Sequence, residues 1–171
     1  STAALLLSST TLAGEGCSPD EAFQTMLKLG GTWTGEAQVV QLGQDREAAS
    51  VSSTTVSFKN IGNSSVMQTF GAGTPSEMIS MYHQDGKNEL IHTHYCAIGN
   101  QPSMTFASTG QQGVIDFKFT KGTNMDVDAD YHAPASNITI CLLYISDAAY
   151  EVDTLVLLLF RYMFKLIHYH H

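Results

Sequence analysis

Polar and hydrophobic residues alternate with a helical period near the start of the chain and with a period of two afterwards. Ser18 is a favourable N-cap, Pro19 suits the first helical position, and Glu21 completes a capping box. Apolar residues then recur at helical spacing until the glycine pair at 30–31. This pattern predicts one short helix of about three turns.

After Thr32 the pattern becomes that of short β-strands separated by turn residues. An Asp-Gly pair at 85–86 and the segment 110–113 are the clearest turns. Closing such a sheet removes its exposed edges, so a single all-β domain, an antiparallel barrel, is expected. The predicted strands span residues 33–42, 49–59, 65–70, 77–83, 89–96, 103–108, 114–119, 137–145, 150–160 and 162–169.

The segment before the helix is apolar and β-compatible. Four of its leucines have no obvious place in the barrel, namely Leu5, Leu6, Leu7 and Leu12. We therefore expect residues 1–17 to form an extended N-terminal arm and residues 18–171 to form the helix and barrel domain. No stretch reaches the roughly 18 apolar residues that a membrane-spanning helix needs.

Net charge and composition indicate which partners and which cellular location to expect. The net charge of −8, with few and scattered basic residues, disfavours nucleic acid and anionic membranes as partners. Only 14% of residues are charged while serine and threonine are abundant, which is typical of extracellular or cell-surface β proteins, with a periplasmic location also open. Asn63 and Asn137 begin possible glycosylation sequons. Among Cys17, Cys96 and Cys141, one disulfide is possible, and its pairing stays open.

Gly31-Thr32-Trp33, directly after the predicted helix, resembles the signature that opens the first strand of lipocalins. The resemblance implies that Trp33 plugs one end of the barrel and that Arg161, near the final strands, packs over it. A buried tryptophan also needs a partner for its indole N–H.

A longer resemblance runs from Met81 to His132. Its elements are Met-Tyr-His-Gln-Asp-Gly at 81–86, Thr-His-Tyr-Cys-Ala at 93–97 and Gly-Asn-Gln-Pro at 99–102, followed by Gly-Thr-Asn at 122–124 and Tyr-His at 131–132. In this order they are similar to a group of uncharacterised bacterial calycin-like proteins, which implies a lipocalin-like β-barrel and no particular activity. The sequence departs from that pattern after about residue 140, where 156–160 is wholly apolar and 167–171 is rich in histidine.

His92, His94 and Cys96 alternate along one predicted strand and therefore share a face. With His132 they offer nitrogen and sulfur ligands that zinc or copper accepts. Three ligands spaced two apart on one strand fit a tetrahedral metal poorly, so we favour polar residues lining a barrel lumen and expect no metal or cofactor.

Two other patterns point to no activity. Asp126, Asp128 and Asp130 alternate, but Tyr131 stands where a calcium-binding EF-hand loop needs glycine, so a solvated acidic loop is favoured. For catalysis, no nucleophile elbow, phosphate loop or dinucleotide motif is present, and Cys96 and His94 are poorly placed for a dyad on one strand. We expect a non-enzymatic protein.

Two functions of different classes remain. In the slightly favoured one, copies of the protein assemble into a structural filament or surface layer by strand addition of the N-terminal arm. In the other, the barrel lumen binds a small apolar ligand, which His94, Asn100 or His132 orients.

Overall fold

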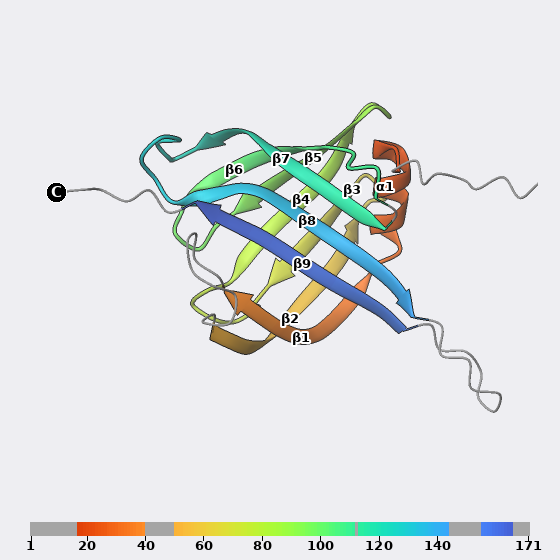
Figure 1. The fold of residues 1–171 in the computed structure, drawn as a ribbon, viewed down its shortest axis with the longest axis horizontal. Coiled ribbons are helices and arrows are strands. Elements are labelled where there is room, and N and C mark those ends of the chain that lie inside the picture. Colours follow the sequence, from red (N-terminus) through yellow and green to blue (C-terminus); the bar gives the residue numbers. More distant parts are fainter. Residues whose placement is uncertain (1–16, 40–49, 112, 144–154, 166–171) are drawn as a thin grey trace, which may run out of the picture.

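The computed structural model describes residues 17–39, 50–111, 113–143 and 155–165. Within these residues the chain forms one α-helix and nine β-strands (Figure 1). In chain order they are α1 (Pro19–Leu27), β1 (Gly31–Val39), β2 (Ser50–Ile61), β3 (Ser65–Phe70), β4 (Met78–Asp85), β5 (Glu89–Tyr95), β6 (Gln101–Phe106), β7 (Val114–Thr123), β8 (His132–Leu143) and β9 (Leu155–Lys165).

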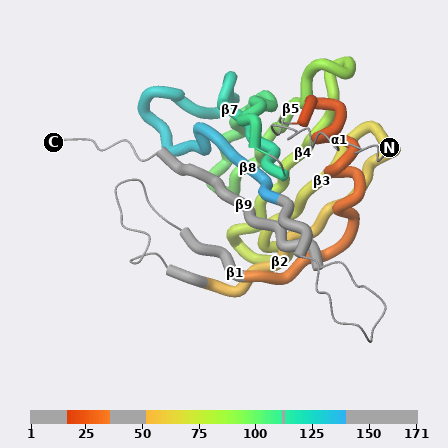
Figure 2. Tube along the Cα trace, turned by 45° about the vertical axis from the view of Figure 1, so that its right-hand side comes forward, coloured from red at the N-terminus to blue at the C-terminus, as the bar shows by residue number. Residues whose placement is uncertain are grey.

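All nine described strands belong to one antiparallel sheet in which each strand pairs with its neighbour in the sequence. The sheet curls on itself, so that β7, β8 and β9 lie opposite β2, β3 and β4 (Figures 1 and 2). The predicted all-β class, the antiparallel sheet and the single short helix are therefore confirmed. In the strand order β1 and β9 are the two edges, and no pairing joins them within the described residues.

Helix α1 begins as its sequence predicts. The Ser18 side chain accepts a hydrogen bond from the backbone N–H of Glu21, and the Glu21 carboxylate accepts one from the Ser18 N–H at 2.8 Å. This capping box satisfies two donors that would otherwise lack partners at the helix start. Ala22, Phe23 and Met26 form the face that the helix buries in the core.

Side-chain hydrogen bonds attach α1 to one end of the curled sheet. The Asn60 amide of β2 donates to the carbonyl of Leu27, and the Gln84 amide of β4 donates to the Asp20 carboxylate. The indole of Trp33, at the start of β1, donates to the carbonyl of Leu29 at 3.0 Å. The helix therefore covers the end of the sheet where β1 starts and β2 and β4 finish (Figure 1).

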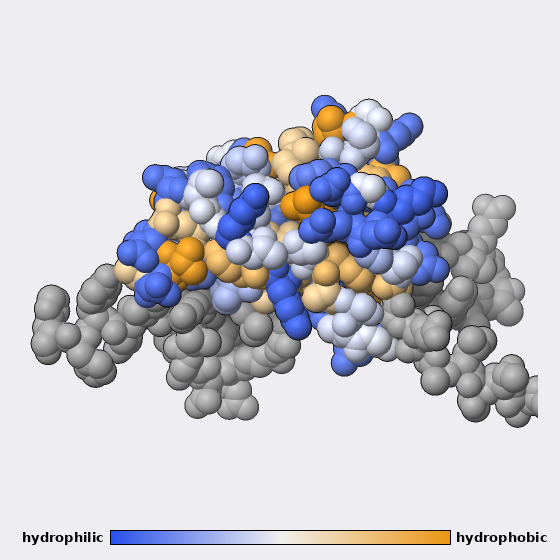
Figure 3. Space-filling view, turned by 90° about the horizontal axis from the view of Figure 1, so that it is seen from above, coloured by the Kyte–Doolittle hydropathy of each residue, from blue (hydrophilic) through white to orange (hydrophobic). Residues whose placement is uncertain are grey.

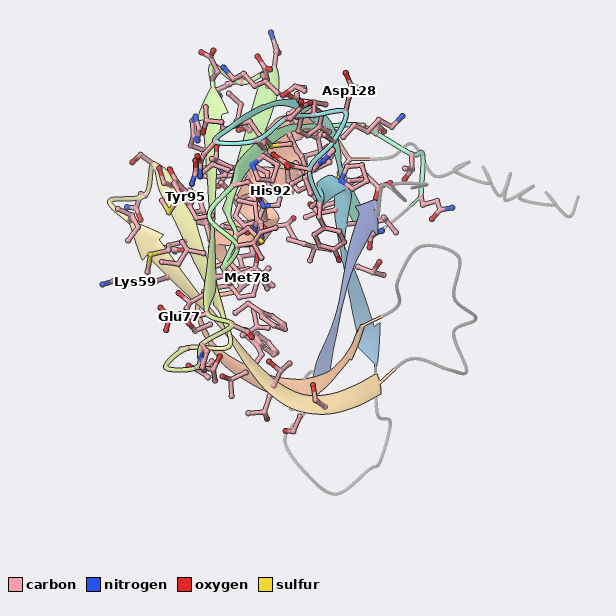
Figure 4. All side chains as sticks on the ribbon, turned by 90° about the vertical axis from the view of Figure 1, so that its left-hand side faces the viewer. Lys59, Glu77, Met78, His92, Tyr95 and Asp128 are labelled. Carbon is pink, nitrogen blue, oxygen red and sulfur yellow. The ribbon has the colours of Figure 1, made fainter. Side chains whose placement is uncertain are left out.

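The core lies inside the curl and is built by alternate residues of each strand. In β5 the burial pattern places Leu90, His92 and His94 inward, while Tyr95 is about half exposed. Figure 4 shows His92 inside the curl and Tyr95 on its outer side. The apolar residues that are almost fully buried are Ala22, Phe23, Met26, Leu29, Val56, Phe58, Val66, Tyr82, Leu90, Met104, Ile115, Phe117, Ala133 and Ile138.

One strand prediction is wrong. The sequence predicted two strands, at 150–160 and 162–169, with a break at Arg161, but residues 155–165 form the single strand β9. Arg161 pairs with Asn137 in the middle of the β8–β9 ladder, so the charged residue interrupts an apolar run without interrupting the strand. The arm residues Leu5, Leu6, Leu7 and Leu12 lie outside the described residues.

The face of the described part that is seen from above carries mainly hydrophilic residues (Figure 3). In the view from above, hydrophobic residues form small groups between polar ones (Figure 3). The large hydrophobic side chains that are exposed are Ile61, Tyr95, Ile98 and Val127. None of the described helices has the length and apolar character to cross a membrane.

Candidate binding site inside the curled sheet

The interior of the curl contains several buried polar side chains. Most of the buried polar residues come from the inward faces of β3, β4, β5 and β8, whereas Thr69 lies on the face of β3 opposite to Gln68, and Asn100 lies in the loop before β6. A buried polar group costs free energy unless it is hydrogen-bonded, so each must be accounted for. The buried polar residues are Gln68, Thr69, Ser80, His92, His94, Asn100, His132 and Ser136.

Tyr82 and His92 form the centre of this interior. The β4–β5 register places them directly opposite each other, and their rings stack with centroids 4.5 Å apart. Phe117 of β7 contacts both rings, at 5.5 Å from Tyr82 and 5.1 Å from His92. The Tyr82 hydroxyl donates to the Gln68 amide oxygen at 2.6 Å. Aromatic packing therefore fills the middle of the curl.

His92 is fully buried, and one of its two ring nitrogens makes a hydrogen bond. Its Nδ1 shares a hydrogen bond with the Ser136 hydroxyl at 2.9 Å, whereas its Nε2 has no hydrogen-bond partner among the described residues. Burial lowers the pKa of His92 well below its usual value near 6.5, and the neighbouring His94 lowers it further. His92 is therefore neutral, and its ring can donate a hydrogen bond to a ligand or accept one from it without carrying a charge.

His94 makes a similar pair with the residue opposite it. The register joins Ser80 to His94, and the Ser80 hydroxyl lies 3.0 Å from His94 Nδ1. Burial lowers the pKa of His94 to about 4. Two serine–histidine pairs suggest nucleophilic catalysis, but an imidazole with so low a pKa is a weak general base. The arrangement is better suited to hydrogen bonding than to proton abstraction.

A second polar group lies toward the end of the curl away from α1. Asn100 donates to the carbonyl of Tyr131 at 2.7 Å, while its own side-chain oxygen has no partner among the described residues. His132 Nδ1 lies 2.9 Å from the carbonyl of Asp130, and its ring packs against Phe119. The predicted lumen residues His94, Asn100 and His132 are thus all buried, and Asn100 contacts the residue directly before His132, which begins β8.

A pocket of about 420 Å³ opens at this same end. The inward ring of Phe70, which also packs against the core, forms part of its wall. Hydroxyl-bearing residues supply most of the remaining lining, and the buried histidines do not line it. The lining residues are Ser52, Ser53, Thr54, Thr55, Phe70, Gly71, Thr74 and Ser76.

The candidate metal ligands are only partly brought together. His92 and His94 share the buried face of β5 with their ring centroids 6.2 Å apart, and Cys96, just past the strand, is half-buried. Within the described residues no three His, Cys, Asp or Glu side chains form a group that could hold a metal ion. The Asp126–Asp130 loop uses its carboxylates on itself, since Asp126 and Asp130 accept backbone N–H bonds from Asp128 and Asp126.

The remaining predicted sites are the barrel plug of Trp33 and Arg161 and the two glycosylation sequons. Trp33 is half-buried at the end covered by α1, with the Leu29 carbonyl as its partner, while the side chain of Arg161 lies outside the described part, so the proposed contact stays a prediction. Asn63 is exposed in the turn between β2 and β3, whereas Asn137 lies in β8, flanked by β7 and β9.

Sequence reasoning missed Gln68, Ser80, Tyr82 and Ser136 as parts of this site. Ser80 and Tyr82 could have been found from the Asp-Gly turn at 85–86, because its register sets the partners of His92 and His94. Ser136 could not have been found in this way, because only the curl of the sheet brings it close to His92. Comparisons of the chain with protein-family models, with curated proteins and with solved structures found no match.

Proposed function

We propose that this protein is a non-enzymatic binding protein that takes a small, mainly apolar ligand into the end of the curl away from α1. The observation that carries the proposal is the pocket bounded by Phe70. Its volume of about 420 Å³ falls within the range of about 300–1,000 Å³ that is usual for small-molecule sites. A lining of one aromatic ring and six hydroxyl-bearing residues suits an apolar molecule that carries a few polar atoms.

The interior beyond the pocket supports the same proposal. Met78 faces Phe70 across β3 and β4, and Ser80 and His94 follow Met78 along the inward face. A ligand that moved the Phe70 ring aside would meet neutral hydrogen-bonding groups rather than charges, because the pKa of His94 is lowered to about 4. Such groups orient a ligand without demanding a charged one.

The test is equilibrium dialysis with N-phenyl-1-naphthylamine, a neutral apolar probe with one N–H donor. Wild-type protein should bind one equivalent. Ser76→Trp, which places an indole in the pocket, should weaken binding at least tenfold. Ser108→Trp is the matched control, because Ser108 is exposed beyond the far end of β6, and it should bind as the wild type does. Equal binding by all three proteins would place the probe elsewhere and refute the pocket as the site.

A second proposal is self-assembly by strand addition. The observation in its favour is that β1 and β9 are edges of the sheet, with no pairing between them in the described part of the chain. An edge strand presents backbone donors and acceptors to which an extended segment of another copy can pair. The apolar segment 1–17 is the proposed donor, which would make the protein a subunit of an extracellular or cell-surface filament.

We also propose that the curled sheet is a barrel of the calycin kind. In its favour are the helix directly before β1, the Gly-Thr-Trp start of β1, and a sheet in which every strand pairs with its chain neighbour. The likeness requires β1 and β9 to approach each other and close the barrel. Backbone amide contacts between β1 and β9 in an NMR spectrum would support it, and their absence in a fully assigned spectrum would contradict it.

A further inference from the structure

Two sulfur atoms meet on the inward face at the end of the curl away from α1. The Cys96 thiol lies 4.0 Å from the Met78 thioether sulfur. The contact follows from the register of β4 and β5. Ile79 pairs with Tyr95, and the next residues toward the end of the curl are Met78 and Cys96. Figure 4 shows Met78 on β4, below His92. The two sulfurs therefore come from neighbouring strands rather than from one.

The surroundings hold this pair in place while leaving it reachable. The backbone N–H of Cys96 donates to the carbonyl of Asn100 at 3.0 Å, which fixes the start of the loop after β5. Cys96 and Met78 are both half-buried. His94 is two residues before Cys96 and shares its face.

We propose that Cys96 and Met78 form a binding site for a soft monovalent cation, Cu(I) in particular. Thiolate and thioether ligands select Cu(I) over harder ions. Two metal–sulfur bonds of about 2.3 Å, the length of a zinc–thiolate bond, that meet at a trigonal angle of about 120° hold their sulfur atoms about 4.0 Å apart. Cys96 and Met78 already have this separation.

The donor set separates Cu(I) from zinc. A structural zinc site needs four nitrogen, sulfur or oxygen ligands, and the described residues hold no group of three His, Cys, Asp or Glu side chains. A low-coordinate Cu(I) ion can use the two sulfurs together with one ligand from solvent, since Cys96 and Met78 are only half-buried. On binding, the Cys96 thiol releases its proton to solvent and the thiolate donates an electron pair. The oxidation state of the ion does not change.

The experiment must resolve the site, because the sequence also contains histidines at 168, 170 and 171 that bind metals on their own. The full chain is labelled with ¹³C in the methyl groups of its seven methionines. Ag(I), a redox-inert probe with the same ligand preference, is added at pH 7 under reducing conditions. We expect one methyl signal to shift with a one-to-one endpoint, and that signal to be missing from the spectrum of Met78→Leu.

Competition with the Cu(I) chelator bathocuproine disulfonate measures the affinity of the wild type and of each variant for Cu(I). Cys96→Ser and Met78→Leu should each lower the affinity for Cu(I) at least tenfold. Cys17→Ser, which removes the other described free cysteine, should leave the affinity unchanged. A stationary Met78 signal at one equivalent of Ag(I), or an unchanged affinity in Cys96→Ser, overturns the proposal. Far-UV circular dichroism of each variant shows that the sheet is intact.

Discussion

His92 of β5 and Ser136 of β8 are joined by a hydrogen bond of 2.9 Å that crosses the interior of the sheet. The two strands are three positions apart in the strand order, so the bond is made by the curl and not by strand pairing. Ser136→Ala leaves the buried Nδ1 of His92 without this partner, which should cost about 1–3 kcal/mol of unfolding free energy. Urea unfolding at pH 7 measures the loss.

Ser103→Ala is the control for that measurement. Ser103 pairs with Thr93 at 3.3 Å on the half-buried outer side of β5 and β6, where water can replace the lost bond. Its effect should stay within about 0.5 kcal/mol, as for most surface substitutions. Equal losses in Ser136→Ala and Ser103→Ala would contradict a special role for the bond across the interior.

Stability should fall as the solution is made mildly acidic. The pKa of His94 is lowered to about 4 and that of His92 is lowered well below 6.5, so below about pH 6.5 the unfolded chain binds protons that the folded chain does not. The stabilisation is complete above pH 6.5 and decreases between pH 6.5 and 4, by at most about 1.4 kcal/mol per pH unit for each histidine. Urea unfolding at half-unit steps of pH measures the slope.

His94→Gln keeps a hydrogen-bonding side chain at this position but removes one titrating group. Its unfolding free energy should depend less steeply on pH between 6.5 and 4.5 than that of the wild type. Thr93→Ser, a substitution of a non-titrating residue on the same strand, is the matched control, and it should retain the wild-type slope. A slope that His94→Gln leaves unchanged would show that other groups cause the acid sensitivity.

The capping box of α1 offers a third prediction. Ser18→Ala removes the oxygen that accepts the Glu21 N–H and should cost about 1 kcal/mol. Ser18→Thr, which keeps that oxygen, should recover most of the loss. Thermal unfolding followed by the fluorescence of Trp33, the single tryptophan, reports on the same end of the molecule. Equal melting temperatures for the alanine and threonine variants would rule out the cap as a source of stability.

Deleting residues 1–13 tests the assembly proposal. If the arm joins neighbouring copies, the intact protein sediments as larger species and the truncated one as a monomer that keeps its β-sheet signal in circular dichroism. The physical reason is that four leucines left in water forgo roughly 1.5–3 kcal/mol each of burial. A truncated protein that unfolds, or an intact protein that is monomeric at high concentration, would mean that the arm serves its own fold.

Local features were predictable from the sequence and contacts across the curl were not. The Ser18 capping box and the run at 65–70 predicted α1 and the bounds of β3, because caps and alternation act over a few residues. The prediction divided β9 at Arg161, although this residue pairs with Asn137 within the ladder of β8 and β9. The bond between His92 and Ser136 spans 44 residues and depends on how far the sheet bends. No periodicity in the sequence encodes that bend.

The strand order, in which every strand pairs with its predecessor, has a consequence for how the chain folds. Each pairing closes only a short loop, so its entropic cost is small and the strands can be added one after another as hairpins. Contacts between distant strands, such as that of β5 with β8, can form only after β6 and β7 have been laid down. We therefore expect substitutions at Tyr82 to slow refolding and substitutions at Ser136 mainly to speed unfolding.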